Sequence, residues 1–260
     1  MTTRDRAPIG SPCWVDLWTS DVEGSRTFYT ELFGWEAQEP SPEFGGYFMF
    51  IRNGVPVAGA MGGDMEGLPG KDSWKIYLAT DDVDKTAEAA TAMGAQILAP
   101  SMPVADLGVQ LVLTDPTGAQ LGVWQPMAFP GFTVMNEPGA PSWFELFTRD
   151  HPASVAFYRS VFQWDTNAVG DSDEFRYTTM RDPGSEEELA GIMDATAWLP
   201  EGVPAHWSIY WQVDDADATV AKVRDLGGSL VADAEDTPYG RLATVADPAG
   251  AQFKLRTVTQ

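Results

Sequence analysis

The feature that most constrains the fold of this chain is an internal repeat, because a sequence that occurs twice predicts one structural unit built twice. The segment CWVDLWTSDVEGSRTFYTELFGWE (residues 13–36) recurs as SWFELFTRDHPASVAFYRSVFQWD (142–165). Further along, WKIYLATDDVDKTAEAATAMGA matches WSIYWQVDDADATVAKVRDLGG, and DPTGAQ matches DPAGAQ near the C-terminus. The matching segments follow in the same order, so the repeat predicts two related halves.

The boundary between the halves is predicted where turn-forming residues replace the repeated pattern. Proline and glycine cluster in QPMAFPGFTVMNEPGAP, which is typical of a connection between domains. We therefore expect one domain over residues 1–126, a linker over 127–140 and a second domain over 141–260. A chain of 260 residues is long enough for two domains of this size.

Charge and hydrophobicity exclude several classes of partner. The formal net charge of -22 repels nucleic acid and anionic membranes. No segment has the length and hydrophobicity of a membrane-spanning helix or the pattern of a secretory signal, so a cytoplasmic protein is expected. The single cysteine, Cys13, rules out a disulfide within the chain.

Each half is itself built from two similar parts. The segment after WVDLWTS begins at Asp21, a helix-capping residue, and ends at Gly34, which indicates a helix between them. A second strand and helix follow, with Asp81 or Asp82 as the cap, and the pair Asn53-Gly54 predicts a tight β-hairpin. Each half therefore reads as strand, helix and three strands, twice over, an α+β fold. Phe28, Trp35, Phe157 and Trp164 recur at matching positions and are expected in the core.

This order of segments, with its FY-containing first helix, its DDVD or DDAD second helix and its DPxGAQ turn, resembles the vicinal oxygen chelate superfamily. That superfamily contains glyoxalases, bleomycin resistance proteins and extradiol dioxygenases, and the chain is similar especially to two-domain glyoxalase-like proteins of actinobacteria. The resemblance implies two tandem domains, each a pair of βαβββ modules forming a cupped mixed sheet. It also implies a divalent metal held by three residues in a cup.

The three ligand positions implied by the resemblance carry unsuitable residues in both halves. They fall on Trp14, Lys75 and Gly122 in the first half and on Trp143, Ser208 and Lys254 in the second. The side chains of tryptophan and glycine have no electron pair that can coordinate a metal, and a protonated lysine repels a cation. We therefore expect no metal and no other cofactor. His151, at a helix start, is expected at the surface, and His206 on the opposite strand face from the ligand position.

Strand alternation predicts which side chains share each cup with these positions. The first cup is expected to hold Trp14, Asp16, Trp18, Lys75, Tyr77 and Trp124. The second is expected to hold Trp143, Glu145, Phe147, Ser208, Tyr210, Lys254 and Arg256. Each cup thus combines aromatic rings with one acid and at least one base, and these residues are the candidate ligand-binding site.

The acid and lysine of each cup have two interpretations. Asp16 with Lys75, and Glu145 with Lys254, can form a buried ion pair that replaces the metal and serves only the structure. The same four residues can instead be catalytic, with the acid as general base and the lysine stabilising an enolate-like oxygen. Neither interpretation is excluded by the sequence.

Three functions follow from these alternatives. The first is a metal-free protein that binds a planar or aromatic small molecule, as the bleomycin resistance branch of the family implies. The second is a lyase or isomerase that works without metal, and the third is a non-catalytic interaction protein. Since the two halves can pair as two subunits would, a monomer or a homodimer is expected.

The two cups are expected to differ in size. Gly122 removes a side chain from the first cup, so this cup is predicted to be the roomier and the ligand site. The second cup is predicted to be closed by an ion pair, with the Lys254 nitrogen within about 4 Å of a Glu145 oxygen.

Overall fold

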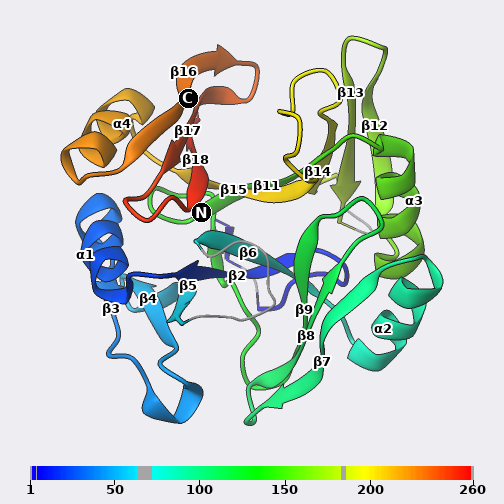
Figure 1. Ribbon diagram of the computed structural model, residues 1–260, viewed down its shortest axis with the longest axis horizontal. Helices are drawn as coiled ribbons and strands as arrows, with labels where there is room; N and C mark the ends of the chain where they lie inside the picture. The colour runs from blue at the N-terminus through cyan, green and yellow to red at the C-terminus, as the bar shows by residue number, and fades with distance from the viewer. Residues whose placement is uncertain (1, 4, 64–71, 183–185, 259–260) are drawn as a thin grey trace.

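The computed structural model of the chain describes residues 2–3, 5–63, 72–182 and 186–258. Over these residues the fold contains two eight-stranded sheets and a short two-stranded one. Each large sheet is built from one half of the sequence, which confirms the predicted α+β fold of two tandem domains (Figure 1).

The first half contains two βαβββ modules in succession. Their elements are β2 (Pro12–Thr19), α1 (Val22–Phe33), β3 (Glu36–Ala37), β4 (Phe48–Arg52) and β5 (Val55–Gly62), then β6 (Ser73–Ala79), α2 (Val83–Ala92), β7 (Gln96–Val104), β8 (Gly108–Thr114) and β9 (Gln120–Pro126). A 3-10 turn, η1 (Pro42–Phe44), precedes β4. In the linker, β10 (Val134–Met135) pairs with β1 (Thr2–Thr3), so part of it is ordered.

The second half repeats this order. Its elements are β11 (Pro141–Thr148), α3 (His151–Phe162), β12 (Asp165–Asp171), β13 (Arg176–Arg181) and β14 (Glu188–Asp194), then β15 (His206–Gln212), α4 (Ala216–Asp225), β16 (Ser229–Thr237), β17 (Gly240–Ala246) and β18 (Gln252–Thr257). The strand orders are β3-β4-β5-β2-β6-β9-β8-β7 and β12-β13-β14-β11-β15-β18-β17-β16. The three strands that carry the predicted ligand positions are therefore neighbours at the centre of each sheet.

The local signals in the sequence form the turns and helix ends that they predict. Asp21 caps α1 by accepting a hydrogen bond from the Gly24 amide, and Gly34 ends the helix in a left-handed conformation. Asp82, of the two candidates, caps α2. Asn53 and Gly54 both have positive φ angles, as a type I′ hairpin between β4 and β5 requires.

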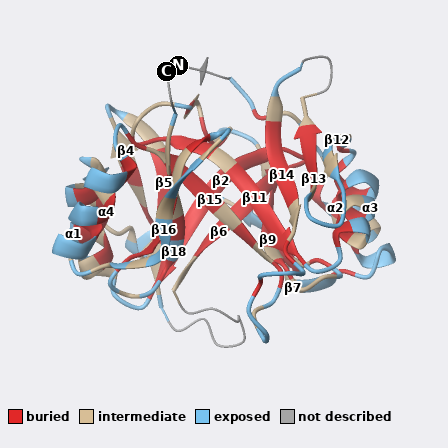
Figure 2. Cartoon of the chain, turned by 90° about the horizontal axis from the view of Figure 1, so that it is seen from above, coloured by how far each residue is buried: buried red, intermediate tan, exposed pale blue. Residues whose placement is uncertain are grey.

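A shared aromatic core joins the two halves. The indole ring of Trp211 in β15 lies 4.9 Å from that of Trp35 and 5.4 Å from that of Trp74, both in the first half. Figure 1 shows α1 beside α4 at one side of the molecule and α2 beside α3 at the other. At each side, a helix of one half therefore lies next to a helix of the other half. The central strands are buried and the helices expose their outer surfaces (Figure 2). The four predicted core aromatics, Phe28, Trp35, Phe157 and Trp164, are all buried.

The repeated Asp-Pro turn takes part in this interface. Asp115 and Asp247 each accept the amide hydrogen of the alanine four residues later, which closes the turn. Each aspartate also accepts a hydrogen bond from a tyrosine of the opposite half, at 3.0 Å from Tyr29 to Asp247 and 2.9 Å from Tyr158 to Asp115. The repeated turn therefore orders a loop in its own half and binds the other half.

No helix among the described residues is long and apolar enough to span a membrane.

Candidate functional site

The face of each sheet that points away from the shared core carries the residues of the two predicted cups. In the first sheet Trp14 lies opposite Tyr77 and Asp16 opposite Lys75 across β2 and β6. In the second sheet Trp143 lies opposite Tyr210, which lies in turn beside Lys254 across β15 and β18. The strands thus bring the predicted residues of each cup together on one face. We call these two groups the N-terminal cup and the C-terminal cup.

Both cups share a tyrosine that the sequence pattern did not identify. The Trp14 indole donates to the Tyr47 hydroxyl at 3.0 Å, and the Trp143 indole donates to the Tyr177 hydroxyl at the same distance. Each tyrosine lies over a glycine of the neighbouring strand, Gly59 or Gly191, where a Cβ would overlap the hydroxyl. The repeat aligns the two tyrosines with each other and the two glycines with each other, and this alignment could have identified them from the sequence.

The acid and base of the N-terminal cup are both buried and not in direct contact. Asp16 accepts hydrogen bonds from Tyr47 and Trp14, each at 2.9 Å. Lys75 donates to Gln120 at 3.1 Å, and its nitrogen lies 4.2 Å from the centre of the Trp18 ring. Burial raises the pKa of Asp16 and lowers the pKa of Lys75 to about 8, because it disfavours both charged forms.

The N-terminal cup is closed by its own side chains. Its six predicted members, Trp14, Asp16, Trp18, Lys75, Tyr77 and Trp124, are each at most 8% exposed. The ring of Phe129, from the linker, lies 4.8 Å from Trp14, and the Phe129 carbonyl accepts a hydrogen bond from Trp124 at 3.0 Å. Gly122 does not open this cup, because the ring of Tyr77 occupies the space where its Cβ would lie. The prediction that this cup is the roomier is therefore wrong.

One polar atom of the N-terminal cup has no partner. The indole nitrogen of Trp18 is buried and makes no hydrogen bond with any described residue. An unsatisfied donor of this kind costs about 1–3 kcal/mol.

The predicted ion pair of the C-terminal cup is absent, although both of its residues are described. Lys254 donates to Thr244 at 3.3 Å, and its nitrogen lies 4.7 Å from the Phe147 ring and 5.3 Å from the Tyr210 ring. Glu145 instead accepts a short hydrogen bond from the Tyr210 hydroxyl. The physical reason is the strand between them: β15 lies between β11 and β18, and its Tyr210 donates to Glu145 while the Lys254 nitrogen lies against the Tyr210 ring.

The C-terminal cup is more open than the N-terminal one. Trp143, Ser208, Lys254 and Arg256 are partly exposed, whereas Glu145, Phe147 and Tyr210 are buried. No ring of a described residue stacks on Trp143, in contrast to the two phenylalanine rings that contact Trp14. Burial lowers the pKa of Lys254, and the negative charge of Glu145 partly offsets that effect.

His206 belongs to the C-terminal cup, contrary to the prediction. It stands two residues before Ser208 on β15, so strand alternation places both on one face. Its ring lies 5.5 Å from Phe147, and its Nδ1 lies 3.1 Å from the Pro204 carbonyl oxygen. Burial lowers the pKa of His206, and the positive charge of Lys254 adds to this.

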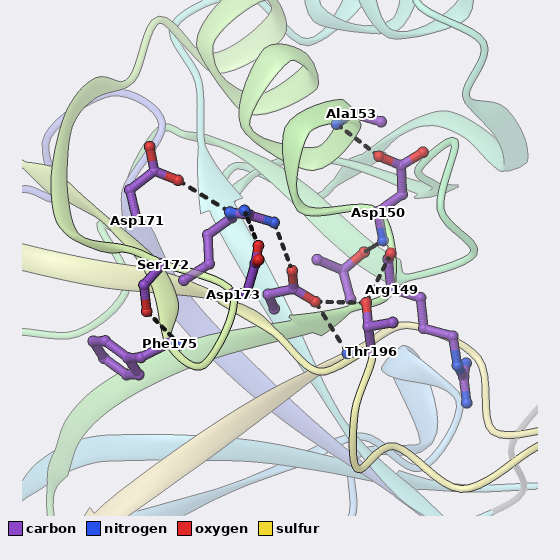
Figure 3. Close-up of polar contacts among 11 residues, drawn as sticks. Arg149, Asp150, Ala153, Asp171, Ser172, Asp173, Phe175 and Thr196 are labelled. Atoms are coloured by element: carbon purple, nitrogen blue, oxygen red, sulfur yellow. Dashed lines mark hydrogen bonds and ion pairs between the residues drawn. The ribbon is translucent and has the colours of Figure 1, made fainter.

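His151 is buried rather than at the surface, which corrects the second prediction for a histidine. It is 6% exposed, and its Nε2 has no hydrogen-bond partner among the described residues. Figure 3 shows Asp150 at the start of α3, where it caps the helix at Ala153, and Asp171 and Asp173 near one guanidinium group. That group belongs to Arg176, which pairs with Asp171 at 3.0 Å and with Asp173 at 3.7 Å. This network lies outside both cups.

The residues at the three metal-ligand positions do not fit a divalent metal in either cup. In the N-terminal cup the three positions, occupied by Trp14, Lys75 and Gly122, provide no set of metal-coordinating atoms. In the C-terminal cup, with Trp143, Ser208 and Lys254, they provide one hydroxyl group, that of Ser208. Within the described ranges no three His, Cys, Asp or Glu side chains are close enough to hold an ion.

A separate hollow of about 270 Å³ lies on the surface between α4 and β16. Among its lining residues Arg241 pairs with Asp217 at 2.6 Å, and Arg241 also pairs with Asp236 at 3.1 Å. The hollow offers no aromatic ring and is a groove beneath the helix.

Comparisons with known proteins agree with the two-domain architecture. Residues 14–124 match the family described as glyoxalase-like domain, and residues 140–255 match the glyoxalase/bleomycin resistance protein/dioxygenase superfamily. The chain is 38% identical over 261 residues to "Putative glyoxylase CFP32" of Mycobacterium tuberculosis (strain CDC 1551 / Oshkosh), covering 98% of this chain and 97% of that protein. It is 34% identical over 264 residues to "Anthracycline biosynthesis protein DnrV" of Streptomyces peucetius, covering 95% and 92%.

Solved structures resemble the fold at low identity. The Mn(II)-bound glyoxalase of Novosphingobium aromaticivorans aligns with a TM-score of 0.65 at 16% identity, covering 96% of this chain and 82% of that one. The 2,3-dioxygenase LapB of Pseudomonas sp. KL28 aligns with a TM-score of 0.65 at 12% identity, covering 98% and 94%. These likenesses show the fold alone. Together with the sequence matches over both halves, they lead to one conclusion: the chain belongs to the glyoxalase/bleomycin resistance protein/dioxygenase superfamily, with one domain of that type in each half.

Proposed function

We propose that the chain binds a small planar aromatic molecule in its C-terminal cup and does so without a metal. The observation that carries this proposal is the partly exposed ring of Trp143, on which no described ring stacks. Its indole nitrogen is held by Tyr177 at 3.0 Å, so the ring is fixed in place before a ligand arrives. A fixed, accessible aromatic face favours stacking of a flat ligand, because little conformational entropy is lost.

The N-terminal cup supports this assignment by contrast. Its equivalent tryptophan, Trp14, contacts Phe129 in an edge-on geometry at 4.8 Å and Phe132 at 5.2 Å. These rings of the linker take the place that a ligand would take, and closed cups argue against binding. The ligand site that we propose is therefore the C-terminal cup and not the N-terminal cup expected from the sequence.

The names of the relatives point to two chemistries. Anthracyclines, in whose biosynthesis one relative is named, are planar fused-ring compounds, which supports a flat aromatic ligand. A glyoxylase label, given to another relative, would favour a metal-dependent reaction. Because neither cup of this chain has a suitable donor set at the family's ligand positions, we propose binding rather than that reaction.

A second candidate function is a metal-independent lyase or isomerase. The observation that favours it is the presence of Glu145, His206 and Lys254 in one cup, with the pKa of Lys254 lowered by burial. The carboxylate or the neutral imidazole would accept a proton from a ligand carbon, and the ammonium would stabilise the developing oxyanion. Proton exchange at an acidic carbon of a bound ligand, measured by NMR in deuterated water, would separate this function from simple binding.

The proposal is tested by calorimetric titration of the protein with 2-naphthamide, before and after exhaustive dialysis against EDTA. We expect the same affinity in both cases, and a loss of roughly 3- to 10-fold in Trp143→Leu, the value of an aromatic contact. Phe44→Leu is the matched control, because Phe44 is 38% exposed and lies in the other half. Binding that appears only after Mn²⁺ or Zn²⁺ is added, or that does not change in Trp143→Leu, would contradict the proposal.

A further inference from the structure

The two cups differ in charge. Arg256 in the C-terminal cup stands where the N-terminal cup has Trp124, as the repeat aligns them. Arg256 and Lys254 are two residues apart on β18, so they lie on the same face of the sheet. Glu145 is the acid among the predicted residues of this cup. The C-terminal cup thus holds two cations and one carboxylate, whereas the N-terminal cup balances Lys75 with Asp16.

Neither cation is neutralised by the described part of the protein. Lys254 and Arg256 form no ion pair with any described carboxylate, in contrast to Arg26, Arg52, Arg176 and Arg241, which all do. Glu145 and Glu235 are close enough to influence Lys254 but make no direct contact with it. In a chain with a net charge of -22, Lys254 and Arg256 place two cations with no described ion-pair partner on the partly exposed face that carries Trp143.

The contacts of these cations hold them in place and leave donor capacity unused. The Nε of Arg256 donates to the Tyr239 carbonyl at 2.9 Å, and one terminal nitrogen approaches the Ser142 carbonyl at 3.5 Å. Lys254 makes one hydrogen bond, to Thr244, and lies over two rings. An ammonium group has three donors and a guanidinium group five, so both can still donate to a ligand.

From this arrangement we infer that the ligand of the C-terminal cup carries an anionic oxygen on its aromatic ring, a carboxylate or a phenolate, which Lys254 and Arg256 bind while the ring lies on Trp143. The inference rests on the proposed function and narrows its ligand class. Charge-assisted hydrogen bonds are about twice as strong as neutral ones. The negative charge of the protein disfavours anions elsewhere on the surface, so we expect the preference for an anionic over a neutral ligand to arise in this cup.

The test compares 2-naphthoate with 2-naphthamide, two ligands of nearly the same shape that differ in charge, by calorimetry at neutral pH. The wild-type protein should bind the naphthoate at least about 10-fold more tightly, the value of a hydrogen bond to a charged group. Lys254→Met and Arg256→Gln should each reduce that preference, and Lys254→Arg should retain most of it. Arg224→Gln, which removes an exposed cation from α4 of the same half, is the matched control and should leave the preference unchanged. Circular dichroism checks that every variant is folded.

The outcomes separate the two proposals. Equal affinities of the wild-type protein for both ligands would overturn the charge inference and leave aromatic binding in place. An equal loss of both ligands in Lys254→Met would also overturn it, because the lysine would then only support the shape of the cup. Binding of neither ligand would overturn the proposed function and this inference with it. A preference for the naphthoate that disappears in Lys254→Met and persists in Arg224→Gln would support both.

Discussion

The tyrosine hydroxyls at the interface between the halves allow a quantitative test of how the domains depend on each other. Tyr29 is fully buried, donates to Asp247 of the other half at 3.0 Å and accepts from the Trp74 indole at 3.2 Å. Tyr29→Phe removes both hydrogen bonds and leaves a ring of the same shape. The exchange therefore measures the polar contribution of the interface and little else.

The expected cost follows from those two bonds. A hydrogen bond to a charged group contributes about 1.5–3 kcal/mol, and a buried donor left without an acceptor costs about 1–3 kcal/mol. Since Asp247 keeps the amide hydrogens of Gly250 and Ala251, we take the lower part of each range and expect a loss of about 3 kcal/mol in the free energy of unfolding. Tyr158→Phe should cost the same, because Tyr158 donates to Asp115 and accepts from Trp207 in the mirror arrangement.

Guanidinium chloride unfolding, followed by far-UV circular dichroism and tryptophan fluorescence, measures these losses. Tyr239→Phe is the control, since Tyr239 is 49% exposed and its change should stay within about 0.5 kcal/mol. Both halves should unfold in one transition in the wild-type protein. A change below 0.5 kcal/mol in Tyr29→Phe, or two separate transitions in the wild-type protein, would refute the reasoning.

Three further predictions concern packing, pH and metals. Gly122→Ala should destabilise the protein by about 1–3 kcal/mol, because the new Cβ overlaps the Tyr77 ring; a thermal unfolding temperature equal to that of the wild type would contradict this. Burial lowers the pKa of His151 below 6.5, so the unfolded state takes up a proton first on acidification. The free energy of unfolding of the wild type, relative to that of His151→Gln, should then fall as the pH drops below 6.5, by at most about 1.4 kcal/mol per pH unit. Urea titrations at stepped pH measure this difference, and a constant value between pH 7.5 and 5.5 would count against the prediction. Methylglyoxal and glutathione should not be turned over with added Zn²⁺, Ni²⁺ or Mn²⁺ in a spectrophotometric assay, and activity that chelation abolishes would show that the ligand positions are misaligned.

Much of the fold could be predicted because its signals are local and occur twice. Aspartate caps, the Asn53-Gly54 hairpin and the order of segments depend on neighbours in the sequence, and the repeat separates them from chance. Alternation along β2 and β11 also predicted which side chains share a face. The prediction for His206 was wrong, although the same alternation places it correctly: it lies two residues from Ser208 and therefore on the same face.

The remaining features of the site depend on which strands are neighbours and on where the linker goes. Lys254 does not pair with Glu145 because Tyr210, on the strand between them, binds that carboxylate, and alternation along one strand does not reveal this. Phe129 closes the N-terminal cup from a segment that is not part of the repeat. Likewise, Gly122 leaves no open space because the ring of Tyr77, on the neighbouring strand, fills it, and the sequence of β9 alone does not reveal this.

The reciprocal tyrosine–aspartate contacts have a consequence for how such a protein can change over evolutionary time. Two identical subunits with these contacts would carry the same mutation in both binding faces, because one gene would encode both. In the fused chain the two copies mutate independently while the exchanged tyrosines keep them together. One copy can then lose its binding site while the other acquires a new ligand, and the contacts that join the two halves are retained.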